Sequence, residues 1–153
     1  LPEGLGVVLQ PAVLVAHVVV QRLLALGEQP ALQVEEQGVL VDVRTRAEWT
    51  YVGVPVLPAD APEVLLVEWL SYPDGQVNQG FLDSLREAGV EPGTPLYFLC
   101  RSGVRSRAAA AAATSSGLGP AHNVLDGFEG GHDDDGHRSV SGWKNVGLPW
   151  RQG

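Results

Sequence analysis

One stretch of the sequence decides the fold: LYFLCRSGVRSRAAAAAA, residues 96–113. Its first four residues are apolar and aromatic, which is typical of a central strand that is buried on both faces. The chain's single cysteine, Cys100, follows directly. Because alanine has the highest helix propensity, the six alanines Ala108–Ala113 predict a helix over residues 106–116. The stretch therefore places a cysteine in a short loop between a buried strand and a helix.

Similar alternation extends to both sides of this stretch. We expect further strands at residues 39–44, 64–67 and 123–125, each a short β-branched or apolar run. A helix at 46–51 would open with the capping-box pair Thr45 and Glu48, and a helix at 79–88 would be capped by Asn78. Strands that alternate with helices predict an α/β fold, in which a central parallel sheet carries helices on both faces.

The ends of the chain are harder to interpret. The apolar segment Ala12–Leu26 fits a buried helix and a strand followed by a helix about equally well. Residues 127–142 are polar and rich in glycine, which indicates a surface loop, and the tail 143–150 carries two tryptophans that we expect to pack back onto the domain. No repeat or linker is evident, so we expect one domain over 1–153 with a recognisable core at 39–150.

Composition excludes several classes of function. A net charge of −8 argues against nucleic-acid binding, which draws most of its affinity from basic residues. No run reaches the ~18 apolar residues of a membrane span, since His17, Gln21 and Arg22 interrupt the longest candidate. One cysteine rules out an intramolecular disulfide and a zinc site of several thiolates. We expect a cytoplasmic protein with no metal and no cofactor.

The loop after Cys100 has the composition of an anion-binding site. Gly103 allows a backbone conformation in which successive N–H groups point inward, and the following helix N-terminus adds free N–H groups. Because cations and helix N-termini favour the thiolate, we expect a nucleophilic Cys100 at neutral pH. Arg101 and Arg105 can attract an oxyanion such as thiosulfate, and Ser102 and Ser106 can donate hydroxyl hydrogen bonds.

At these residues the sequence resembles the rhodanese family. The loop Cys-Arg-Ser-Gly-Val-Arg-Ser at 100–106 is similar to the rhodanese active-site loop in length and composition. The segment 40–49, with Asp42, Arg44 and the pair Glu48-Trp49, resembles a second family element. Segments 123–131 and 142–150 resemble its last strand and closing segment, so the likeness spans about residues 38–150. The usual Gly-His-Ile element is replaced by Gly53-Val54-Pro55.

The resemblance implies a rhodanese-like three-layer fold with a parallel sheet of about five strands. It implies a sulfurtransferase that moves sulfur from thiosulfate or a similar donor, through a Cys100 persulfide, to cyanide, a thiol or a thioredoxin-like protein. Its loop residues would form the substrate site: Arg101, Ser102, Gly103, Val104, Arg105 and Ser106. Asp42 and Arg44 would give structural support, because a buried Asp needs a hydrogen-bonding or ionic partner.

Three alternatives stay open. A cysteine phosphatase or arsenate reductase needs five residues between Cys and Arg, but here only four separate Cys100 from Arg105. A non-catalytic rhodanese-like binding or regulatory module is the second, although such modules commonly lack the cysteine. Loose metal binding by the His/Asp loop at 130–138 is the third, and we favour a solvated loop there. The segment 59–79, with Trp69 and Tyr72, either walls the pocket and selects the acceptor or packs in the core.

Overall fold

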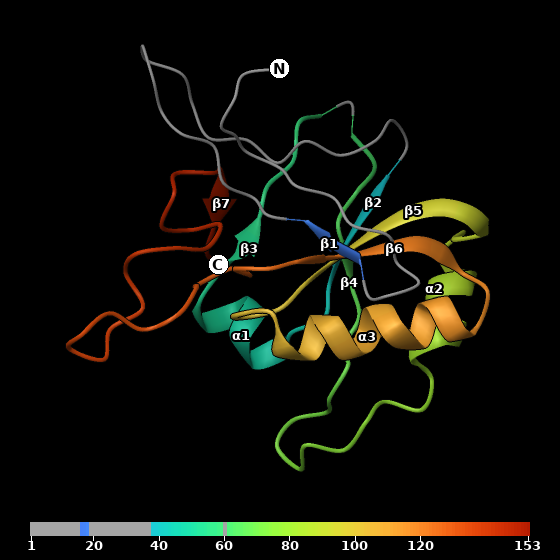
Figure 1. The fold of residues 1–153 in the computed structure, drawn as a ribbon, viewed down its shortest axis with the longest axis horizontal. Coiled ribbons are helices and arrows are strands. Elements are labelled where there is room, and N and C mark those ends of the chain that lie inside the picture. The colour runs from blue at the N-terminus through green and yellow to red at the C-terminus, as the bar shows by residue number, and fades with distance from the viewer. Residues whose placement is uncertain (1–15, 19–37, 60) are drawn as a thin grey trace.

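A computed structural model describes residues 16–18, 38–59 and 61–153 of the chain, the first three by their backbone only. Five parallel strands form one sheet in the order β1-β6-β5-β2-β4. They are β1 (Ala16–Val18), β2 (Val39–Asp42), β4 (Leu65–Leu66), β5 (Pro92–Leu99) and β6 (Gly119–Val124). Strand β5, which ends directly before Cys100, lies in the middle of this sheet (Figure 1). The predicted α/β fold with a central parallel sheet is confirmed.

Side chains that alternate along the strands divide the core into two clusters. From β5, Leu96 and Phe98 face helices α2 (Phe81–Glu87) and α3 (Val104–Ser115). The neighbouring Tyr97 and Leu99 face the opposite side, where they meet Phe128, Trp143, Leu148 and Val52, the residue after helix α1 (Arg46–Tyr51). Both faces of the sheet are therefore covered, one by α2 and α3 and the other by the end of α1 and the C-terminal segment, which gives three layers.

The C-terminal tail packs back onto the domain, as the two tryptophans predicted. Trp143 is buried, and its indole N–H donates to the carbonyl of Pro149 at 2.6 Å. Strand β7 (Trp150–Arg151) then pairs antiparallel with β3 (Val54–Pro55), a two-stranded sheet that we did not predict. Its strand β3 belongs to Gly53-Val54-Pro55, the segment that stands where the rhodanese family has its Gly-His-Ile element.

Several predicted boundaries are corrected. β5 begins at Pro92 and β6 at Gly119, because Pro92 and Gly119 are paired across the sheet despite their turn-like sequences. Helix α3 begins at Val104, two residues earlier than predicted, directly after Gly103. Asn78 is not the cap of α2, whose N-cap is Gly80; its side chain bridges the amide of Gly80 and the carbonyl of Glu68 instead.

The N-terminal region is described only at Ala16–Val18, which forms β1 and pairs with β6 from His122 to Val124. A strand is therefore present within Ala12–Leu26, and the remainder of that prediction lies outside the described residues. Among the helices of the described residues, none has the length and apolar character that crossing a bilayer requires.

Candidate active site

Cys100 lies at the carboxyl edge of the parallel sheet, the edge at which ligands bind in open α/β folds. The loop from Cys100 to Gly103 joins β5 to α3 and passes beside α1 (Figure 1). The backbone of the loop is held by the C-terminal segment, because Phe128 donates to the carbonyl of Cys100 and Glu129 to that of Arg101. Only 1% of Cys100 is exposed, so a reacting partner can reach it with little more than a single atom.

Two groups that can donate hydrogen bonds lie next to the sulfur. The backbone N–H of Gly103 and the hydroxyl of Ser106 each lie 3.1 Å from Cys100 Sγ. The first turn of α3 also directs its partial positive charge toward this position. The same groups that stabilise a thiolate here would stabilise the terminal sulfur of a persulfide, which is also anionic.

Gly103 permits this geometry for two reasons. Its φ of +107° lies in the left-handed region, which residues with a side chain rarely adopt. A Cβ atom at this position would lie 2.3 Å from the carbonyl oxygen of Leu125, closer than any real contact. The loop can therefore fold back over the sulfur only because residue 103 is glycine.

Asn123 is a residue of the site that the sequence analysis missed. It is buried in β6, where its Oδ1 accepts from Ser106 Oγ at 2.5 Å and its Nδ2 donates to the carbonyl of Gly103 at 3.1 Å. One amide thus fixes both residues that contact the sulfur. The available signal was a polar side chain in an apolar strand, at a position paired with Phe98 two residues before Cys100.

Arg105 is paired with a carboxylate. Its two terminal nitrogens donate to Glu48 at 2.7 and 2.9 Å, which joins the first turn of α3 to helix α1. Glu48 also accepts hydrogen bonds from the N–H and the hydroxyl of Thr45, so the predicted capping box is present. The same carboxylate therefore both caps α1 and pairs with Arg105. Nothing in the sequence spacing indicated a partner 57 residues away.

The ion pair sets the charge state of both groups. Burial alone would raise the pKa of Glu48, but the hydrogen bonds and charge of Arg105, together with Thr45, lower that pKa to about 2. The hydrogen bonds that Arg105 donates to Glu48 raise the pKa of Arg105 despite its burial, and the nearby Cys100 and Asp42 act in the same direction. Arg105 therefore carries a charge that Glu48 already compensates, and an incoming anion meets it as half of a neutral pair.

The other predicted loop residues have different positions. Arg101 is exposed and lines a cleft beside the loop, whereas Ser102 is half-buried. Val104 is 77% exposed at the start of α3, so its side chain points away from the core. The structure thus brings Gly103, Ser106 and Cys100 into contact and leaves Arg101 as the accessible cation of the loop.

Asp42 and Arg44 form a fully buried pair at the end of β2. Arg44 Nε lies 2.9 Å from Asp42 Oδ1, and Arg44 Nη2 lies 2.7 Å from both Asp42 Oδ2 and the carbonyl of Gly53. The guanidinium carbon also sits 4.2 Å from the centre of the Phe128 ring. The pair joins β2 to the start of β3 and to the C-terminal segment, a position consistent with the structural role predicted for it.

A cleft of about 540 Å³ lies at the mouth of the loop. Its walls come from α1, from the segment before α2 and from the loop itself: Thr45, Ala47, Glu48, Tyr51, Val52, Leu70, Ser71, Tyr72, Pro73, Gly75, Arg101 and Arg105. The segment 59–79 therefore both lines the cleft and packs in the core, whereas its selection of an acceptor stays a prediction. Tyr72 walls the cleft, whereas Trp69 packs edge-on against Phe81 with ring centres 5.1 Å apart.

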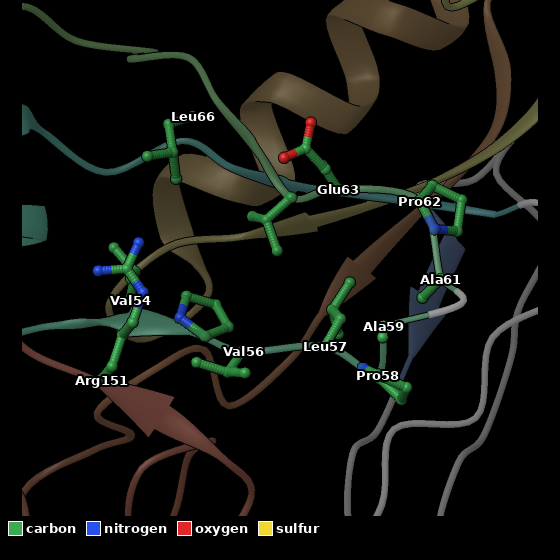
Figure 2. Close-up of a pocket in the computed structure, with 12 residues that line it drawn as sticks. Val54, Val56, Leu57, Pro58, Ala59, Ala61, Pro62, Glu63, Leu66 and Arg151 are labelled. Carbon is green, nitrogen blue, oxygen red and sulfur yellow. The ribbon is translucent and has the colours of Figure 1, made fainter.

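A second cavity, of about 300 Å³, shares no residue with the Cys100 loop. Figure 2 shows its wall of short apolar side chains between residues 54 and 66, with Glu63 and Arg151 at different parts of the rim.

In the 130–138 loop, Asp133 accepts hydrogen bonds from the backbone of Asp135 and His137 and from Ser139. These contacts lower the pKa of Asp133 and give its carboxylate an ordinary role in shaping an exposed loop.

Comparisons with known proteins give relatives that match about three quarters of the chain. No protein-family model matches the chain. The uncharacterized protein RC0915 of Rickettsia conorii is 40% identical over 113 residues, which are 73% of this chain and 81% of that protein. The uncharacterized protein RP600 of Rickettsia prowazekii is 38% identical over 113 residues, with the same coverage of both chains. The crystal structure of Rv0390 from M. tuberculosis has 55% identity and a TM-score of 0.69, covering 76% of this chain and 86% of that one.

Proposed function

The chain belongs to the protein family that includes RC0915 of Rickettsia conorii and Rv0390 of M. tuberculosis, and we propose that it is a rhodanese-type sulfurtransferase. The reaction would use Cys100 as nucleophile and carry sulfur as a persulfide on it. One observation supports this most directly: at the N-terminus of a twelve-residue helix, the sulfur of the only cysteine accepts a hydrogen bond from the N–H of Gly103 and lies 3.1 Å from the hydroxyl of Ser106. Such a cradle suits one anionic sulfur atom.

The first half-reaction loads the cysteine. The thiolate of Cys100 attacks the outer sulfur of thiosulfate, a new S–S bond forms, and the old one breaks. Its electron pair leaves with sulfite, and the negative charge that began on Cys100 ends on the outer sulfur of the persulfide. No proton is transferred, so the step needs no general base.

The second half-reaction discharges the persulfide. Cyanide, a small thiol or a thioredoxin-like protein attacks the outer sulfur and leaves with it, and the thiolate of Cys100 is restored. Because Cys100 is almost fully buried, the outer sulfur is the atom that an acceptor can reach. A cytoplasmic location is part of the same proposal, since that compartment keeps thiols reduced.

The charge arrangement supports sulfur transfer over phosphoryl transfer. A phosphate carries two negative charges and needs a free bidentate guanidinium, yet both terminal nitrogens of Arg105 are engaged by Glu48. The remaining groups around Cys100 are two donors to one atom, which is a small cradle. The rhodanese reading therefore fits the described contacts better than the phosphatase reading.

Turnover tests the proposal. We expect the purified protein to form thiocyanate from thiosulfate and cyanide, and Cys100→Ser to lose that activity while keeping the wild-type circular dichroism spectrum. A folded wild-type protein that gives no thiocyanate and no sulfite with any sulfane donor would instead favour the non-catalytic binding module.

A further inference from the structure

The cleft beside Cys100 has a composition that thiosulfate does not need. Thr45 and Glu48 in its wall are hydrogen-bonded to each other, and the wall also holds six apolar or aromatic residues: Ala47, Tyr51, Val52, Leu70, Tyr72 and Pro73. Tyr51 and Tyr72 are 76% and 68% exposed, although burying aromatic rings is favourable. Both rings also line an adjoining hollow of about 370 Å³, which continues the cleft over α1. Two exposed aromatic rings that line one cleft beside a site indicate a ligand with an organic group.

The charge of the cleft limits the ligand further. Its charged members are Glu48, Arg101 and Arg105, and the ion pair between Glu48 and Arg105 is neutral. Arg101 forms no ion pair with residues 38–59 and 61–153, so among the described residues the cleft has one positive charge without a paired carboxylate. A ligand with a single negative charge matches this site, whereas the dianion thiosulfate leaves one charge unmatched.

The depth of Cys100 decides how such a ligand must be built. With 1% of the residue exposed, only a narrow terminal atom can enter the loop, and the body of the donor must stay outside. Arg105 connects the two regions, because it lines the cleft and its charge interacts with Cys100. A terminal sulfur on an organic body would place the sulfur at Cys100 and the body between the tyrosines.

We infer that the cleft binds organic sulfane-sulfur monoanions, with Tyr51 and Tyr72 as the residues that determine specificity for the organic group. This inference rests on the proposed persulfide chemistry and specifies its donor. For an organic thiosulfonate, the thiolate of Cys100 attacks the terminal sulfur, and the bond from that sulfur to the sulfonyl group breaks. The electron pair leaves with the sulfinate, and the persulfide retains one negative charge.

Three donors separate the contribution of the organic group from the contribution of the charge. Benzenethiosulfonate has the ring and one charge, methanethiosulfonate has one charge and almost no organic body, and thiosulfate has two charges and none. We expect kcat/KM to follow that order. The double variant Tyr51→Ala/Tyr72→Ala should lower the ratio of kcat/KM for benzenethiosulfonate over methanethiosulfonate about tenfold, the effect of losing a modest apolar contact.

A matched variant tests the rings themselves. Tyr51→Phe/Tyr72→Phe keeps both rings and should keep the wild-type ratio. An unchanged ratio in the alanine variant, or equal preference of the wild type for the two thiosulfonates, would overturn the inference. Loading by thiosulfate in those samples would show that the sulfurtransferase proposal survives that result, whereas no loading by any of the three donors would contradict the proposal itself.

Discussion

Ser106 has one hydroxyl hydrogen and two neighbours that can accept it. Asn123 Oδ1 lies 2.5 Å from the hydroxyl oxygen and Cys100 Sγ lies 3.1 Å from it. The amide of Asn123 is held in one orientation by its bond to the carbonyl of Gly103. A negative sulfur attracts the hydroxyl hydrogen more strongly than a neutral thiol does, so we expect Ser106 to turn toward Cys100 when charge develops there.

Replacing Ser106 should therefore slow the chemistry. A hydrogen bond to a charged group contributes ~1.5–3 kcal/mol, so Ser106→Ala should reduce the rate of sulfur loading by roughly 10- to 100-fold. Single-turnover sulfite release measures that rate. Arg107→Ala, on the exposed side of the same helix, is the matched control and should leave it unchanged. Equal loading rates for Ser106→Ala and the wild type would show that the hydroxyl of Ser106 does not contribute to the reaction.

Glu48 makes the stability of the protein depend on acid pH. Its pKa is about 2 in the folded protein, below its ordinary value of 4.5. The folded state therefore binds the proton less readily than the unfolded state, and the carboxylate stabilises the fold fully above pH 4.5. That stabilisation decreases as the pH falls through the interval between the two values and is lost at about pH 2.

The variant Glu48→Gln isolates this contribution. It should be less stable than the wild type near neutral pH, because it leaves Arg105 without a charged partner. The difference in urea midpoint between the two proteins should shrink as the pH is lowered from 4.5 toward 2. A difference that stays constant over this interval would mean that the ion pair does not govern the acid response.

At the scale of elements, α3 is held between two left-handed glycines, Gly103 before it and Gly117 after it. The two positions differ in their surroundings. A Cβ atom at residue 117 would meet nothing within 4 Å, whereas one at residue 103 would lie 2.3 Å from Leu125 O. The first glycine is required by close approach as well as by backbone conformation, and the second by conformation alone.

These two glycines form a matched pair of variants. Gly117→Ala should lower the free energy of unfolding by about 1 kcal/mol, the cost of a left-handed alanine, and should keep normal sulfur loading. Gly103→Ala should be more destabilising and should lose loading, because the loop must move away from Leu125 and Asn123. Thermal denaturation and sulfite release compare them, and equal behaviour would contradict the close-packing argument.

The elements themselves could largely be predicted from the sequence. The alanine run, the apolar stretch before Cys100 and the Thr45–Glu48 capping box each carry a local signal, and each element is present. The two-stranded β3-β7 sheet and the bond between Glu48 and Arg105 could not be predicted, since each joins residues far apart in the chain. Asn123 was missed because a single buried amide has no periodicity of its own.

At the scale of the whole molecule, the buried pair of Asp42 and Arg44 connects the sheet to its outer layer. Arg44 donates a hydrogen bond to the carbonyl of Gly53 before β3 and stacks on the ring of Phe128 in the C-terminal segment. The backbone N–H of Phe128 in turn donates to the carbonyl of Cys100. The loop that follows Cys100 is therefore supported, through Phe128, by a fully buried ion pair.

A double-variant cycle measures this support. Removing one member of a buried pair leaves an uncompensated charge and typically costs 3–5 kcal/mol, so Asp42→Asn and Arg44→Met should each be strongly destabilising. The double variant should be less destabilised than the sum of the two, because no lone charge remains. Additive losses in urea denaturation would show that the two side chains stabilise the fold independently.

The central claim is that Cys100 carries sulfur, and intact-protein mass spectrometry tests it most directly. The chain has one cysteine, so any sulfur that a thiol reagent removes must come from that residue. After incubation with thiosulfate or benzenethiosulfonate, we predict a mass gain of one sulfur atom in the wild type, reversed by cyanide or dithiothreitol and absent in Cys100→Ser. No gain with either donor, or an equal gain in the serine variant, would contradict the account.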